Sequence, residues 1–78
     1  MISGVLVASR PEDLAAVTEA VEAFPWADVH HSDPAGRLVV TVEANGTGDS
    51  IERAETLQQL PRVLSVSLAE YRIEEDDI

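Results

Sequence analysis

Residues 33–43 read DPAGRLVVTVE, a turn followed by the most strand-like run in the chain. The aspartate, proline and glycine of this stretch stand at positions that favour a tight turn. In the run that follows, Leu38, Val40 and Val42 recur at every second residue, which is the period of a strand with one buried face. The stretch therefore predicts the turn and the second strand of a β-hairpin.

Strand and helix patterns alternate on both sides of this hairpin. Strands are predicted at residues 2–9, at about residues 27–32, and at residues 63–71. The second of these is polar, which places it at an edge of the sheet. Apolar residues spaced by three and four predict two helices between the strands. The stripes are Leu14, Val17, Val21 and Phe24 in the first helix, and Ile51, Ala54, Leu57 and Leu60 in the second.

Prolines and polar residues mark the helix ends. Pro11 stands where proline is tolerated, at the first helical position. Asp49 or Ser50 is expected to cap the second helix. Each helix ends on a large apolar residue followed by proline, at residues 24–25 and 60–61, so the two halves of the chain repeat one pattern.

The order βαββαβ predicts an α+β domain with a ferredoxin-like fold. Right-handed crossovers put both helices on one face of a four-stranded antiparallel sheet and leave the other face uncovered. We expect one domain over residues 1–73, because a chain of 78 residues holds a single core. Residues 74–78 are expected to form a mobile acidic tail.

The uncovered face is the predicted binding site, and strand parity selects its residues. Strands three and four should expose one residue in two. On the third strand the exposed set is Val39, Thr41 and Glu43, and on the fourth it is Ser65, Ser67 and Tyr71, while Leu64, Val66 and Leu68 face the helices. The first strand allows two assignments. Val5 and Val7 in the core leave Gly4 and Leu6 exposed, whereas the opposite choice exposes Ser3 and Val5.

Composition narrows the class of partner. Five arginines, no lysine and fifteen acidic residues give a net charge of -10, which repels nucleic acid and anionic lipid and attracts basic partners. The same acidity also serves solubility. The absence of cysteine excludes disulfides, thiolate metal sites and redox dithiols, and it favours a cytoplasmic location.

No pattern in the chain predicts catalysis, a bound metal or a cofactor. A phosphate-binding loop needs a lysine that the sequence lacks. His30 and His31 are adjacent, so on a regular strand they point to opposite faces and do not share one metal ion. Trp26 allows two interpretations, a cover for the end of the core or an exposed anchor for a partner.

The ordered combination of several stretches resembles the NapD family, the chaperones of periplasmic nitrate reductase. They are the first strand at residues 2–7, the Phe24-Pro25 corner, the hairpin at residues 32–44, and residues 60–68 followed by Tyr71. Family members often have glycine after the helix-ending proline, where this chain has Trp26 and Arg62. The resemblance covers residues 2 to about 72.

The resemblance implies a cytoplasmic, cofactor-free chaperone. It would bind the twin-arginine signal peptide of the nitrate reductase catalytic subunit and delay export until the molybdenum cofactor is inserted. Our site hypothesis assigns Glu43, Glu70 and the acidic tail to the arginines. Docking is assigned to Val39, Thr41, Ser65, Ser67 and Tyr71.

The sequence allows alternatives for the binding mode, the oligomeric state and the function. The peptide binds either as a helix on the open face or as a strand added to the second strand's edge. The oligomeric state is a monomer or a weak dimer. The alternative function is a small-ligand regulatory domain of the ACT type, which shares the βαββαβ order and predicts a dimer with a pocket near residues 9–12.

Overall fold

The computed structural model describes residues 1–69, and it confirms the βαββαβ order. The elements are β1 (Ile2–Ser9), a short 3-10 helix η1 (Pro11–Asp13), α1 (Leu14–Glu22), β2 (Ala27–Asp33), β3 (Arg37–Glu43), α2 (Thr47–Gln58) and β4 (Val63–Ala69). The end of the predicted fourth strand and the acidic tail lie outside the described residues. Within residues 1–69, no helix has both the length and the apolar character needed to cross a membrane.

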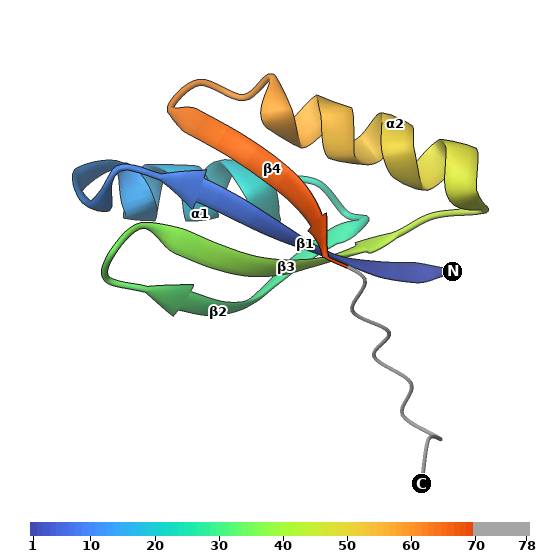
Figure 1. Cartoon of the computed structure of the whole chain (residues 1–78), viewed down its shortest axis with the longest axis horizontal. Helices are drawn as coiled ribbons and strands as arrows, with labels where there is room; N and C mark the ends of the chain where they lie inside the picture. The colour runs from blue at the N-terminus through green and yellow to red at the C-terminus, as the bar shows by residue number, and fades with distance from the viewer. Residues whose placement is uncertain (70–78) are drawn as a thin grey trace, which may run out of the picture.

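The four strands form one antiparallel sheet in the order β2-β3-β1-β4. The central strands β1 and β3 come from opposite halves of the chain, and β2 and β4 form the two edges. Figure 1 shows α1 and α2 on the same side of the sheet, which leaves the other face free of helices. The predicted ferredoxin-like arrangement is therefore confirmed.

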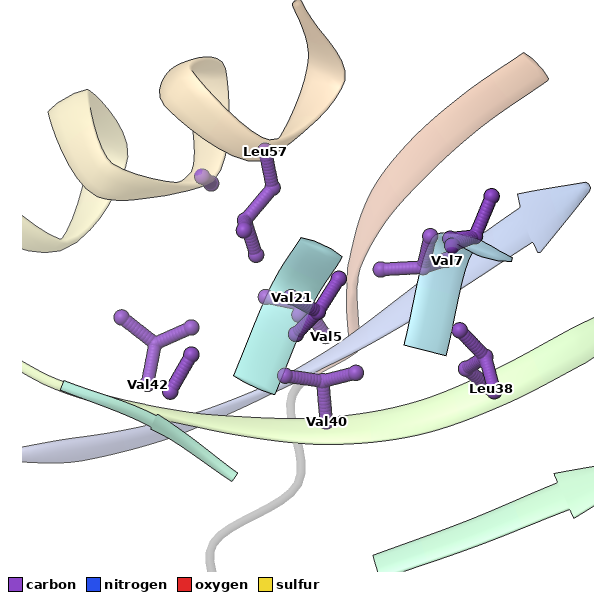
Figure 2. Packing of buried hydrophobic residues seen from close by; sticks show 10 residues of the cluster. Val5, Val7, Val21, Leu38, Val40, Val42 and Leu57 are labelled. Atoms are coloured by element: carbon purple, nitrogen blue, oxygen red, sulfur yellow. The ribbon is translucent and has the colours of Figure 1, made fainter. Parts of the chain in front are cut away.

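The core lies between the helices and the two central strands. Figure 2 shows valines and leucines of β1, β3 and both helices pointing into one cluster. Val5 and Val7 are buried in this cluster, so the first of the two assignments for the first strand is correct. On β3, the predicted core residues Leu38, Val40 and Val42 are fully buried.

The hairpin turn between β2 and β3 depends on Gly36. The Gly36 N–H donates to the Asp33 carbonyl at 2.8 Å, and the Ala35 N–H donates to Asp33 Oδ1 at 2.9 Å. Gly36 has a φ of 106°, a conformation that glycine adopts at little cost. The Ser9 N–H also donates to the Gly36 carbonyl at 2.7 Å, which joins the turn to the end of β1.

The two helix-to-strand corners share a hydrogen-bond pattern but differ in backbone conformation. Ala27 N–H donates to the Phe24 carbonyl at 3.2 Å, and Val63 N–H donates to the Leu60 carbonyl at 3.3 Å. Arg62 has a φ of 72°, and among residues 1–69 no other non-glycine residue has a positive φ. The second corner therefore has the turn that favours glycine after proline, with arginine in that place.

Replacing Arg62 with glycine is expected to raise the free energy of unfolding by about 0.5–1 kcal/mol, because a left-handed conformation costs a residue with a Cβ about 1–2 kcal/mol. The ion pair between Arg62 Nε and Asp13 Oδ1, at 3.6 Å, offsets little of this because the arginine side chain is largely exposed. Urea denaturation measures the change. Trp26→Gly is the matched control and should destabilise the fold, since Trp26 lacks the positive φ and packs against the core.

The start and buried face of α2 differ from the prediction. The helix begins at Thr47, and neither Asp49 nor Ser50 is its cap; instead Asp49 Oδ2 accepts the Asn45 N–H at 3.0 Å. Ser50 is buried, and its hydroxyl bonds to that of Ser3 at 2.8 Å. Ile51, which was predicted in the buried stripe, is 43% exposed. The face that meets the sheet runs through Ser50, Ala54 and Leu57, and Ile51 is rotated about 100° around the helix from Ser50.

The first helix differs only at its ends. Pro11 begins the short 3-10 turn η1 rather than α1, and α1 ends at Glu22, before the proline that was expected to end it. The predicted stripe is correct, since Val17 and Val21 are buried and Leu14 and Phe24 pack against the core.

Candidate functional site

The sheet face opposite the helices is the candidate site, and the strand register defines its residues. Partners across antiparallel strands project to the same side, so the residues beside the core set belong to this face. We call it the open face. Its members on β1, β3 and β4 are Ile2, Gly4, Leu6, Ala8, Arg37, Val39, Thr41, Glu43, Ser65 and Ser67.

Five of the seven predicted site residues lie on the open face. Val39 is half-buried, and Glu43, Ser65 and Ser67 are exposed. Leu6 separates the β3 and β4 groups, because it pairs with Val39 on one side and Ser67 on the other. The remaining two predictions, Glu70 and Tyr71, lie outside the described residues.

Thr41 is on the predicted face but is nearly buried there. Its side chain is only 9% exposed, and Thr41 Oγ1 lies 2.7 Å from His30 Nε2 in a hydrogen bond. Its backbone is flanked by β1 and β2, where Gly4 and Asp28 are its partners. The Thr41 hydroxyl thus already has one hydrogen-bond partner, and its role in docking stays a prediction.

An irregularity in β2 brings both histidines to the open face. The register with β3 shifts between Val29 and His31, so that His31 lies opposite Val39 while His30 bonds to Thr41. The expectation that the two side chains point to opposite faces assumed a regular strand and is wrong, because a bulge interrupts the alternation. Within residues 1–69, no group of three histidine or acidic side chains is placed to hold a metal ion.

Burial on β4 also departs from the prediction. Val66 packs against the core as expected, but Leu64 is 62% exposed and Leu68 is 52% exposed. Leu64 has no partner on β1, because the register shifts beside it. Leu68 pairs with Val5 and so lies on the helix side, but it belongs to an edge strand that the helices only partly cover. Gly4, which was expected to be exposed, is buried in the central strand.

The middle of the open face is apolar. Leu6 is 38% exposed and Ile2 is 51% exposed, and both are large apolar side chains on the central strand β1. With half-buried Val39 they form a stripe, which we call the apolar stripe. Neither Ile2 nor Leu6 was among the predicted site residues. The signal was present in the chain, because placing Val5 and Val7 in the core leaves Leu6 on the other side.

Charge distinguishes the two ends of the apolar stripe. At one end, Glu43 on β3 pairs with Ile2. Thr41 precedes Glu43 by two residues on the same face of β3, and Asp28 on β2 lies opposite Thr41. At the other end, Arg37 lies opposite Asp33, so the two charges offset each other. We call the end that carries Glu43 and Asp28 the acidic end of the open face. Arg53, which pairs with Asp49, and the Met1 ammonium, which donates to the Ala44 carbonyl at 3.0 Å, lie beside it.

Contacts from α2 and the first corner hold the backbone of Glu43 in place. Its N–H donates to the Trp26 carbonyl at 2.8 Å, and Arg53 Nη1 donates to its carbonyl oxygen at 2.6 Å. The Arg53 guanidinium lies 5.2 Å from the centre of the Trp26 ring and pairs with Asp49 at 3.5 Å.

Trp26 is structural. Its ring stacks on Phe24 with centroids 4.6 Å apart, and it packs against the core. Of the two interpretations of this residue, the cover for the end of the core is correct.

A hollow of about 320 Å³ opens beside Glu43; it is lined by Met1, Ile2, Glu43, Ala44, Asn45 and Arg53.

The fold and the open face together define a small ferredoxin-like binding domain, with an apolar stripe that is acidic at one end. Comparison with known proteins narrows this class. A family model described as NapD protein matches residues 1–75, and the chain belongs to the NapD family.

Named relatives agree with this assignment. Proteins named Chaperone NapD from Escherichia coli K12 and from Shigella flexneri are each 32% identical over 75 residues, covering 95% of this chain and 86% of theirs. The solution structure of the E. coli Tat proofreading chaperone protein NapD superposes with a TM-score of 0.83 at 32% identity, covering 96% of this chain and 80% of that chain. The prediction of a non-enzymatic NapD-type chaperone is confirmed.

Proposed function

We propose that this chain binds the twin-arginine signal peptide of the periplasmic nitrate reductase precursor in the cytoplasm and delays its export until the cofactor is inserted. The observation that carries the proposal is the pairing of the apolar stripe with the acidic end on one uncovered face. A twin-arginine signal has a basic region followed by an apolar stretch. The two parts of the open face match the two parts of such a peptide in order.

The charges give the proposal a direction. The two arginines of the peptide lie at the acidic end, where Glu43 and Asp28 offer carboxylates, and the apolar stretch runs along Ile2, Leu6 and Val39. Arginine binds carboxylates through paired, charge-assisted hydrogen bonds, which suits this end of the face. The rigid Glu43 backbone lowers the entropy that binding costs, since the residue does not have to be ordered first.

A helix on the open face is favoured over a strand added to β2. The outer edge of β2 carries Asp28, His30 and His31, and a bulge interrupts it. Charges and bulges protect an edge against strand addition. The apolar stripe instead offers a broad surface across β1 and β3, and an amphipathic helix binds such a surface with one face.

Family membership also supports the chaperone function over the ACT-type alternative considered from the sequence. The ACT-type alternative placed a ligand pocket near residues 9–12. The Ser9 side chain there is buried, and its hydroxyl lies 3.1 Å from the Arg10 carbonyl and 3.3 Å from the Gly36 carbonyl. These contacts make Ser9 part of the hairpin junction, and the match to the NapD family supports the chaperone.

The test is a calorimetric titration with a synthetic twin-arginine signal peptide and with the same peptide carrying glutamine at both arginines. We expect the glutamine peptide to bind about tenfold more weakly, since two charge-assisted contacts are lost. We also expect the affinity for the arginine peptide to fall as salt rises.

The site assignment has its own pair of variants. Glu43→Gln should weaken binding of the arginine peptide about threefold and leave the glutamine peptide unaffected. Glu55→Gln, on the exposed side of α2, removes the same charge away from the open face and should change neither affinity. Equal binding of the two peptides would contradict the proposed function, and equal effects of the two variants would contradict the site.

A further inference from the structure

The outer edge of β4 is a second surface, apart from the open face, that is available to a partner. Within the described part of the chain, β4 pairs with β1 alone. An edge strand presents a row of unpaired backbone N–H and C=O groups, and these form a template for another strand. Proteins protect such edges with charged side chains, prolines or bulges.

The two edges of this sheet are protected to different degrees. The β2 edge has three charged or titratable residues in its middle and a bulge. In contrast, β4 reads VLSVSLA over residues 63–69 and contains no charged residue and no proline. The register of β4 with β1 shifts at Leu64, which is the extra residue of a bulge at the first end of the strand, and runs evenly from Ser65 to Ala69.

The β4 sequence is nearly the same in both directions. About Val66 as the centre, serine stands on both sides at positions 65 and 67, and leucine follows on both sides at positions 64 and 68. Two copies that pair antiparallel about Val66 therefore place Leu64 of one opposite Leu68 of the other, and Ser65 opposite Ser67. Two-fold symmetry makes each pair occur twice, as an isologous interface requires.

Formation of these pairs would bury apolar side chains that are exposed in the single chain. Leu64 and Leu68 are 62% and 52% exposed, which leaves apolar surface in contact with water at both ends of the strand. Ser65 and Ser67 are exposed between them. Cross-strand leucine pairs bury apolar area, and cross-strand serine pairs form hydrogen bonds between their hydroxyls.

We propose that two copies of this chain associate through β4, in antiparallel register about Val66, to form one continuous eight-stranded sheet. The occupant of this edge is a second copy because the strand is complementary to itself. A two-fold axis normal to the sheet keeps the helices of both copies on one side. The two open faces then join on the other side, with Ser65 and Ser67 of both copies at the seam. This association does not depend on the proposed signal-peptide function.

Net charge makes the dimer weak and sets its response to salt. Each copy carries a net charge of -10, and two such copies repel each other. Salt screens this repulsion, while the contacts along β4 contain no charge for salt to weaken. Dimerisation is therefore expected to increase with salt. Binding of the arginine peptide is expected to decrease with salt. The two proposals therefore predict opposite responses to a rise in salt concentration.

Sedimentation equilibrium of the full chain, from about 10 μM to about 1 mM, tests the association, because small interfaces give dissociation constants in this range. We expect the average mass to rise from 8.4 kDa toward twice that value, and to rise at lower concentration in high salt. The double variant Leu64→Glu with Leu68→Glu should stay at 8.4 kDa. Gln58→Glu with Gln59→Glu adds the same charge at the C-terminal end of α2 and should dimerise like the unmodified chain, with circular dichroism showing that all three are folded.

Mixing variants tests the register. A copy with lysine at positions 64 and 68 should be monomeric alone, but should form a heterodimer with the glutamate variant, since opposite charges then face each other twice. Single changes then fix the register: Leu64→Lys should pair with Leu68→Glu more strongly than with Leu64→Glu, because only the first combination places opposite charges across from each other in the antiparallel register. A monomer at every concentration of the unmodified chain overturns the proposal, and so does equal dimerisation of the β4 and α2 glutamate variants.

Nuclear magnetic resonance of the unmodified chain keeps the test decisive if a β4 variant does not fold. On dilution from about 1 mM, amide signals of residues 63–69 are expected to shift more than those of β2. Shifts confined to β2, or to the helices, would place the interface elsewhere and reject β4.

Discussion

Replacing Gly36 with alanine is expected to lower the free energy of unfolding by about 3 kcal/mol, a large part of the roughly 5–15 kcal/mol that stabilises a typical domain. Two effects combine at this position. A Cβ at Gly36 would collide with the backbone carbonyl of Ser9, and backbone cannot move aside as a flexible side chain can. The φ of 106° also disfavours any residue with a Cβ.

The measurement is urea denaturation followed by circular dichroism, and Gly48→Ala is the matched control. Gly48 lies in the first turn of α2, and a Cβ there meets nothing within 4 Å. Alanine is a better helix former than glycine by about 1 kcal/mol, so this variant should be equally or more stable. A Gly36→Ala protein as stable as the Gly48→Ala protein would show that β1 and the hairpin turn are not in the close contact described.

Replacing Leu6 with lysine is expected to weaken binding of the twin-arginine peptide at least fiftyfold, about 2–3 kcal/mol. Leu6 lies at the centre of the apolar stripe, between Val39 and Ser67. A lysine there would place an ammonium group under the apolar part of the peptide and remove an apolar contact. The added charge would also repel the basic region of the peptide.

The control for this variant is Ile51→Lys. Ile51 has an exposure of 43%, close to the 38% of Leu6, but it lies on α2, on the other side of the sheet. Both changes alter net charge equally, so the difference between them isolates position. Both proteins should remain folded, because a long lysine side chain can extend from a partly exposed site to water. Similar affinities of the two variants for the peptide would show that the peptide does not bind on the open face.

The central strands and the fold order were predictable from the sequence because their patterns are regular. Large apolar residues at every second position from Leu38 to Val42 predicted which side of β3 is buried, and the structure agrees. The hairpin turn was predictable for the same kind of reason, since Asp33 and Gly36 each have a defined conformational role. On β1, a run of apolar residues suits both faces, and only the packing against β3 and the helices separates Val5 from Leu6.

The errors of prediction occur where the regular period breaks or where coverage is incomplete. The bulge in β2 has no distinct sequence pattern, because His30 and His31 are polar on either face. Leucines at positions 64 and 68 look like core residues, yet an edge strand buries only what the helices reach. Helix α2 begins with Thr47 and Gly48, which are weak helix formers, so its start was misplaced. Its buried face includes the polar Ser50, which an apolar pattern does not reveal.

The position of β1 at the centre of the sheet has a consequence for how the chain acquires its structure. Ile2 pairs with Glu43, and Gly4 pairs with Ala69, so the first strand has no partner among the residues that immediately follow it. Contacts between such distant residues slow folding, because a long loop must close before they form. During synthesis the first half emerges with its apolar strand and helix unpartnered. The native sheet can form only when residues up to β4 have left the ribosome, so these four strands must form as one unit rather than one after another.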